Sequence, residues 1–406
     1  MNVRRMIPLF ICASVLAATV LLSALSKPAA RESAAEAVTR TDNSATADEP
    51  PEKVREMRGV WVTYMDLSME NEPNRSEGAF REKFAHIAKV CADSGFNTLI
   101  VQVRPFCDAL YPSGYFPWSH ILSGQQGVSP GYDPLADICD ICRTFGLDIH
   151  AWVNPYRVSV SQTPRELSDG NPFVTHPEMC IETESGVILD PSSADARELI
   201  ENGVRELIEN YDIDGIQFDD YFYPTDIGEL DKEQYEAFLD TSATGKPDWH
   251  RWREINVNIL IAEVAMLVQN SGKDVVFGIS PQGNLANNDA LCADVTSWCC
   301  AMGYADYVCP QIYFSPDNPK LGFAEALSDW TSLDRARSVK LYAGLAGYKA
   351  GTDADEGTWL DREDILKGEY LLLKEKGLDG FMLYSFPSLE SEEAGAEIRN
   401  LLSVLE

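Results

Sequence analysis

A repeated alternation of short apolar strands with amphipathic helices constrains the fold of this chain most strongly. From Met57 onward the pattern recurs eight times. We expect strands at residues 59–64, 98–104, 148–154, 215–219, 275–280, 307–313, 340–344 and 380–385. Helical periodicity fills the intervals, for example over 79–94, 194–211, 254–269 and 362–376. Such alternation favours parallel βαβ units.

Eight βαβ units in about 350 residues fit an α/β fold, the (β/α)₈ TIM barrel, with some long loops. An open doubly wound sheet is the alternative, but the first predicted strand is not followed by the Gly-rich turn that binds phosphate in such sheets. At 45% hydrophobic and 24% charged residues, the composition is that of a globular protein. We therefore predict a single TIM-barrel domain over residues 57–406.

One face of several predicted strands is polar or aromatic. By strand alternation, Gln102 and Arg104 share a face, as do Trp152 and Asn154, while the opposite faces are apolar. Because the apolar faces suit packing against the outer helices, the polar faces are predicted to line the barrel interior and its carboxyl-terminal end. This favours a polar ligand. The alternative is a buried network in which these groups satisfy one another.

Two adjacent carboxyl groups, Asp219 and Asp220, end the fourth predicted strand and are the catalytic candidates. Neighbouring carboxyls can hold different protonation states, because burial and like charge raise one pKa. The other strand ends are poor in acids. Asp66, Asp108 and Asp190 are loop candidates for a partner, although each also suits a turn or cap. The pattern favours either one acid working with a substrate 2-acetamido group or a second acid from a loop.

Aromatic, amide and basic side chains gather near the same strand ends and suit the faces and hydroxyls of sugars. The predicted substrate-binding residues are Arg104, Asp108, Trp152, Asn154, Tyr156, Arg157, Tyr221, Gln282, Gln311 and Tyr313. The sequence contains no Walker phosphate loop. We therefore expect a polysaccharide partner and no cofactor.

The amino-terminal residues are typical of an export signal. Arg4 and Arg5 precede an uncharged apolar run to Ser26 that could be a cleaved signal peptide or a membrane anchor. Residues 27–56 are rich in Ala, Ser, Thr, Pro and Glu, which predicts a disordered acidic tether. The chain is thus expected outside the cytoplasmic membrane, either secreted or anchored, with this segment as its only membrane attachment.

The formal charge of −31 argues against nucleic acid and anionic membranes as partners. The two arginines of residues 1–26 balance the excess of seven acidic over five basic residues in 27–56, so the charge belongs to the predicted barrel. The five histidines are scattered, which predicts no metal site. Without Cys12 nine cysteines remain, and several fall on apolar faces, so buried thiols are expected rather than a disulfide framework.

Long stretches of the chain resemble the glycosyl-hydrolase-like family-10 barrels, which are exported bacterial proteins. Among the matching stretches are residues 57–63, 96–105, 150–157, 211–224 and 310–313. The resemblance covers about residues 56–406 and implies a TIM barrel that cleaves bacterial cell-envelope glycans, with Asp219 and Asp220 as catalytic residues. The chain departs from the family pattern after Pro281, where Gln282-Gly-Asn284 follows.

We therefore expect an exported glycoside hydrolase acting on an amino-sugar-containing envelope or extracellular polysaccharide, most nearly peptidoglycan-like glycan strands. A non-catalytic glycan-binding barrel is the second hypothesis, because the partner acid is not evident from the sequence. A hydrolase of neutral plant-type polysaccharides is the third.

Overall fold

The computed structural model describes residues 55–161, 163–164, 166–242 and 245–405. The predicted signal or anchor at 1–26, and the predicted tether at 27–56 except for its last two residues, lie outside the described residues. Among the helices that are described, none combines the length and apolar character needed to cross a bilayer.

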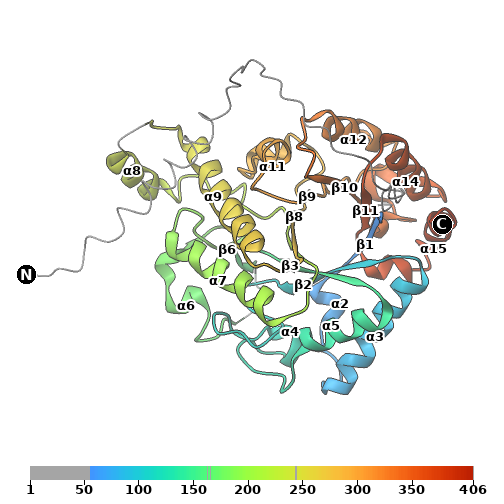
Figure 1. The fold of residues 1–406 in the computed structure, drawn as a ribbon, viewed down its shortest axis with the longest axis horizontal. Coiled ribbons are helices and arrows are strands. Elements are labelled where there is room, and N and C mark those ends of the chain that lie inside the picture. Colours follow the sequence, from blue (N-terminus) through green and yellow to red (C-terminus); the bar gives the residue numbers. More distant parts are fainter. Residues whose placement is uncertain (1–54, 162, 165, 243–244, 406) are drawn as a thin grey trace, which may run out of the picture. The chain divides into compact units, whose positions relative to one another are not determined.

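Eight parallel strands close into a barrel, which confirms the predicted TIM-barrel fold (Figure 1). In order around the barrel they are β1 (Met57–Val62), β2 (Thr98–Arg104), β3 (Asp148–Val153), β7 (Gly215–Phe218), β8 (Val276–Ile279), β9 (Tyr307–Val308), β10 (Lys340–Leu345) and β11 (Gly380–Leu383). Pairing of β1 with both β2 and β11 closes the ring, so the sheet is not open.

Helices surround the strands as the sequence pattern predicts (Figure 1). The larger ones are α3 (Glu77–Asp93), α5 (Pro134–Phe145), α7 (Ala194–Asn210), α9 (Trp249–Asn270), α12 (Phe323–Ser332), α14 (Ile365–Lys376) and α15 (Gly395–Leu402). Several begin at a side chain that accepts a hydrogen bond from the first helical turn, namely Ser76, Asp133, Ser193 and Asp248. Their buried faces pack on the apolar outer face of the strands in one continuous core.

Short helices occupy the loops. These are α2 (Tyr64–Leu67), α4 (His120–Ser123), α6 (Pro172–Thr175), α10 (Asn287–Ala290), α11 (Val295–Cys300) and α13 (Ala354–Gly357), with 3₁₀ turns at Pro177–Met179, Gly347–Lys349 and Phe386–Leu389.

Two features were not predicted from the sequence. A small antiparallel sheet of β4 (Arg157–Val160), β6 (Gly186–Leu189) and β5 (Cys180–Glu182) is inserted between β3 and α7. Its strands span only three or four residues, too few for alternation to identify. Helix α8 (Lys232–Thr241) lies outside the ring of helices and has no fully buried residue (Figure 1).

Large aromatic side chains fill the barrel interior because glycines on neighbouring strands leave room for them. A Cβ at Gly278 would lie 1.9 Å from Cζ of Tyr307, and a Cβ at Gly215 would lie 2.7 Å from the His150 ring. Tyr307 OH in turn lies 2.9 Å from Nδ1 of His150 and accepts from Nε2 of Gln217 at 3.1 Å. For these deeper polar residues the structure shows a buried network rather than a ligand site.

The cysteines pack as the sequence predicts. All nine within the described ranges are free thiols, and Cys139 and Cys142 lie in the buried face of α5. Burial raises the pKa of the Cys139 thiol to about 12, so it behaves as a small apolar side chain.

Candidate active site

Asp219 follows the last residue of β7 and is 3% exposed. Its Oδ2 accepts hydrogen bonds from Nε1 of Trp152 at 3.2 Å and from Nδ2 of Asn154. Its Oδ1 accepts from the backbone N–H of Tyr221 at 3.4 Å. Burial raises the pKa of Asp219 to about 7, because desolvation outweighs the opposing charge of Arg157. Near neutral pH this carboxyl can therefore both hold and release a proton.

Asp220 is held by side chains that follow the next two strands around the barrel, β8 and β9. Nε2 of Gln311 donates to its Oδ1 at 2.9 Å, and Nε2 of Gln282 donates to its Oδ2. Burial raises the pKa of Asp220, and the two amide donors oppose that shift by stabilising the carboxylate. The two neighbouring carboxyls thus bind different partners on different strands, as expected of groups with different roles.

The orientation of Asn154 is fixed by two donors to its carbonyl oxygen. Nε2 of Gln102 and Nη2 of Arg157 donate to Oδ1 of Asn154 at 2.7 and 2.8 Å. Its amide nitrogen must therefore face Asp219. Nε of Arg157 also donates to the Pro105 carbonyl at 2.8 Å. The sequence predicts that Gln102 lies on the polar face of its strand, but Gln102 is not among the predicted binding residues. Its position on that inward face was the signal that could have identified it.

An aromatic cluster, consisting of Trp61, Tyr313, Tyr348 and Tyr384, lies at the carboxyl-terminal ends of β1 and β9–β11. Ring centroids of contacting members are 5.5–6.4 Å apart. Burial raises the pKa of Tyr313 and of Tyr384, and the charges of Asp220 and Asp219, respectively, add to these shifts, so the carboxyl pair acts on both rings through its charge. Of the four, only Tyr313 is among the substrate-binding residues predicted from the sequence, and Tyr348 is 48% exposed.

A family model described as "Glycosyl hydrolase-like 10" matches residues 56–361. The chain belongs to this family. It is 33% identical over 367 residues to glycosyl hydrolase YngK of Bacillus subtilis, covering 84% of this chain and 70% of the relative. It is 32% identical over 343 residues to glycosyl hydrolase DigH of Escherichia coli K12, covering 75% of this chain and 76% of the relative. The resemblance noted in the sequence is confirmed.

Solved structures of similar fold include a glycoside hydrolase domain and the catalytic domain of a β-amylase. The PgaB (BpsB) glycoside hydrolase domain of Bordetella bronchiseptica superposes with a TM-score of 0.58 at 14% identity, covering 86% of this chain and 99% of that one. The catalytic domain of β-amylase from Paenibacillus polymyxa gives 0.55 at 11% identity, covering 86% and 98%. These likenesses support the barrel fold of this family member.

Arg104 does not face the barrel interior, contrary to the prediction. The register between β2 and β3 shifts between Gln102 and Arg104, so that Arg104 pairs with Val153 on the outward face. Its guanidinium lies 4.5 Å from the ring centroid of Phe116 and contacts α7 at Gly203. The shift adds one residue to β2 and so turns Arg104 to the opposite face of the strand. Of the two arginines predicted for the candidate site, only Arg157 lies in it.

Asp108 and Tyr156 lie in the protein core, both with 0% exposure. Asp108 accepts from the Phe106 backbone N–H at 3.2 Å and from Nε2 of Gln126 at 3.2 Å, which orders the loop after β2. Tyr156 lies near Arg197 on α7. Both side chains are therefore buried in the core around the site and do not line it, contrary to the prediction that they bind substrate. The structure brings together the remaining predicted residues Trp152, Asn154, Arg157, Asp219, Asp220, Tyr221, Gln282, Gln311 and Tyr313.

The loop acids Asp66 and Asp190, named from the sequence as candidate partners of Asp219, have local hydrogen-bond partners. Oδ2 of Asp66 accepts from the backbone N–H and Oγ1 of Thr63 at 2.7 and 2.8 Å, forming the cap of α2. Oδ1 of Asp190 accepts from the Ser192 N–H and hydroxyl at 2.8 and 2.7 Å. Their turn and cap roles leave Asp219 and Asp220 as the carboxyl pair best placed for chemistry.

Proposed function

We propose that the protein is an exported glycoside hydrolase that cleaves an amino-sugar-containing polysaccharide, with peptidoglycan-like glycan strands as its substrate. Membership of a glycosyl-hydrolase-like family supports the reaction class. The observation that carries the proposal is the pair of adjacent buried carboxyls, of which Asp219 has a pKa raised to about 7. Export rests on the amino-terminal sequence, residues 1–26.

In the proposed mechanism, Asp219 donates its proton to the glycosidic oxygen as the bond to the anomeric carbon breaks. The carbonyl oxygen of the substrate's 2-acetamido group attacks that carbon, while the Asp220 carboxylate accepts a hydrogen bond from the acetamido N–H. Water then opens the cyclic intermediate and returns a proton to Asp219. This scheme needs no second acid across the sugar, which agrees with the local bonding of the loop acids Asp66 and Asp190.

The proposed glycan contacts divide into an aromatic and a cationic side. Tyr313, Tyr348 and Tyr384 supply rings for the C–H faces of sugars. Trp61, which is 2% exposed, packs behind Tyr313 and Tyr384. Arg157, half-buried over the Tyr221 ring at 5.1 Å, supplies one positive charge. On a barrel that carries the chain's −31, this arginine is the group that would accept a lactyl carboxylate of peptidoglycan.

The test compares release of reducing ends from denuded peptidoglycan, chitin oligomers and poly-glucosamine by wild type and Asp219→Asn. We expect activity on an amino-sugar polymer that falls by at least 10³-fold in Asp219→Asn. Asp212→Asn is the matched control, because Asp212 lies in the same sequence stretch but is exposed and pairs with Arg143 outside the site. Equal rates in wild type and Asp219→Asn would refute the assignment.

A non-catalytic glycan-binding barrel is the second candidate, and the local bonding of Asp66, Asp108 and Asp190 is the observation that favours it. Without a partner acid or a reactive acetamido group, the same aromatic and amide groups would bind sugar and leave it intact. Saturable binding of chitin or muropeptide fragments without turnover on any of the three polymers would support this candidate over hydrolysis.

A further inference from the structure

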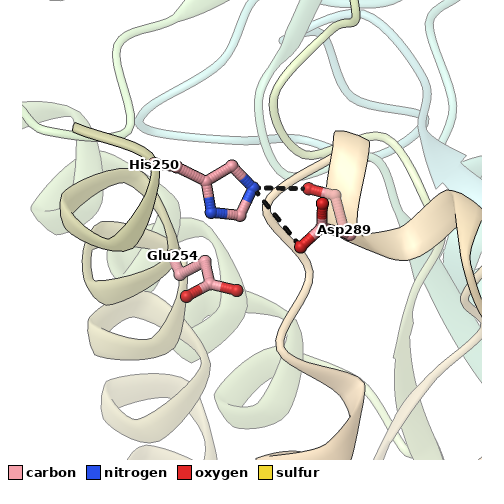
Figure 2. Close-up of side chains that lie close together, drawn as sticks. All are labelled: His250, Glu254 and Asp289. Atoms are coloured by element: carbon pink, nitrogen blue, oxygen red, sulfur yellow. Dashed lines mark hydrogen bonds and ion pairs between the residues drawn. The ribbon is translucent and has the colours of Figure 1, made fainter. Parts of the chain in front are cut away.

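Three metal-ligating side chains converge at the rim of the barrel, away from the carboxyl pair. His250 and Glu254 lie one turn apart near the start of α9, and Asp289 in α10 faces them (Figure 2). One ligand atom from each residue lies within 4.8 Å of the other two. Nε2 of His250 is 2.9 Å from the backbone oxygen of Asp289 and 3.6 Å from its Oδ1. We propose that these residues bind a zinc-class divalent cation.

The donor set selects the class of metal. An imidazole nitrogen with two carboxylates suits Zn²⁺ and neighbouring transition metals, whereas Ca²⁺ and Mg²⁺ prefer oxygen ligands throughout. Ligand atoms of a tetrahedral zinc site stand about 3.4 Å apart, given bonds of about 2.1 Å. The ligand atoms lie within 4.8 Å of one another, so they must approach by up to about 1.4 Å. His250 and Asp289 are exposed and can rotate, whereas the Glu254 side chain is 16% exposed and must leave Arg251.

A neighbouring arginine competes with the cation for Glu254, whereas the negative charge of the chain favours cation binding. Nη1 of Arg251 donates to Oε2 of Glu254 at 2.7 Å and also lies 3.1 Å from Oδ2 of Asp294. A bound cation would take Glu254 from Arg251, which would keep Asp294 as its partner. The net charge of −31 raises the local concentration of cations. Among the described residues, no other group of three or more such ligands meets the same distance criterion.

The cation would join α9 to the loop that supports Asp220. Asn288 precedes Asp289, and its side chain accepts from the backbone N–H of Gln282 and donates to the Gln282 carbonyl, each at 3.0 Å. Gln282 in turn donates to Asp220. A cation at His250 would therefore restrain the loop that carries Gln282. The cation site itself does not depend on the proposed hydrolase activity.

Tag-free protein titrated calorimetrically with Zn²⁺, and separately with Ca²⁺, at about 0.15 M ionic strength tests the proposal. We expect one Zn²⁺ per chain, bound at least tenfold more tightly than Ca²⁺, and a rise in Tm with Zn²⁺. His250→Ala and Asp289→Asn should each weaken Zn²⁺ binding at least tenfold. Circular dichroism verifies that both variants fold, which their exposed positions favour.

Two variants serve as controls. His176→Ala removes an exposed histidine whose Nδ1 contacts a single carboxylate, that of Glu178 at 3.1 Å, and should leave Zn²⁺ binding unchanged. Cys300→Ser removes the exposed thiol and should also have no effect. Absence of saturable Zn²⁺ binding, wild-type affinity in His250→Ala, equal affinity for Ca²⁺, or loss of binding in Cys300→Ser would each overturn the proposal.

Discussion

Replacing Asp219 with asparagine should stabilise the protein at neutral and alkaline pH. Burial raises the pKa of Asp219 from 3.8 to about 7 in the folded state. Between these two values the unfolded chain is ionised at this residue and the folded chain is protonated. The free energy of unfolding therefore falls by about 1.4 kcal/mol per pH unit as pH rises through this window, and Asp219→Asn lacks this loss.

The full window of about three pKa units corresponds to about 4 kcal/mol. The substitution also has a cost. Asparagine Oδ1 can accept from Trp152 and Asn154, but its amide nitrogen would face the backbone N–H of Tyr221, donor against donor. That conflict costs about 1–2 kcal/mol. We thus expect Asp219→Asn to exceed wild type by about 2–3 kcal/mol at pH 8 and to lose this advantage near pH 4.

Urea unfolding at pH 4, 5, 6, 7 and 8 of wild type, Asp219→Asn and Asp212→Asn measures the effect. The difference between Asp219→Asn and wild type should grow with pH up to about 7 and then level off, whereas Asp212→Asn should follow wild type throughout. A difference independent of pH, or an Asp219→Asn protein less stable than wild type at pH 8, would refute the reasoning from burial.

Three other substitutions test the core and the site. Gly278→Ala places a methyl group against the Tyr307 ring and should lower the free energy of unfolding, measured by urea unfolding, by about 3 kcal/mol. Gly368→Ala is the control: it lies in an open position on α14 and should raise that free energy by up to about 1 kcal/mol. Glu369 is buried and has no hydrogen-bond partner among the residues that the structure describes, and its pKa is raised well above the usual value. Glu369→Met should therefore raise the Tm, and by more at pH 8 than at pH 5. Gln311→Ala removes a donor to Asp220 at 2.9 Å, so the acidic limb of the kcat/KM profile should move upward by about one pH unit; an unmoved limb would contradict this.

Much of the candidate site follows from the sequence because it depends on strand alternation. Gln102, Trp152, Asn154 and Asp219 point into the barrel as the period of two requires. The same argument failed at Arg104, two residues beyond Gln102. A bulge adds one residue to β2, and only pairing with β3 shows it.

The order of the barrel strands and their main helices, the apolar outer faces of the strands and the burial of most cysteines could be predicted from the sequence alone. These features follow from local periodicity and from the transfer of apolar side chains out of water. The sequence also placed Asp219 and Asp220 at a strand end. Family membership followed from long matching stretches, whose order along the chain needs no coordinates.

Which distant side chains meet could not be predicted before the chain is folded. Gln282 and Gln311 both reach Asp220 because β8 and β9 follow β7 around the closed barrel. His250 meets Asp289, 39 residues along the chain, because α9 and α10 lie at the same rim. Such meetings depend on barrel closure and on the paths of loops, which are non-local and leave no period in the sequence. Closure also set the pKa of Asp219, because burial of that carboxyl requires the surrounding strands.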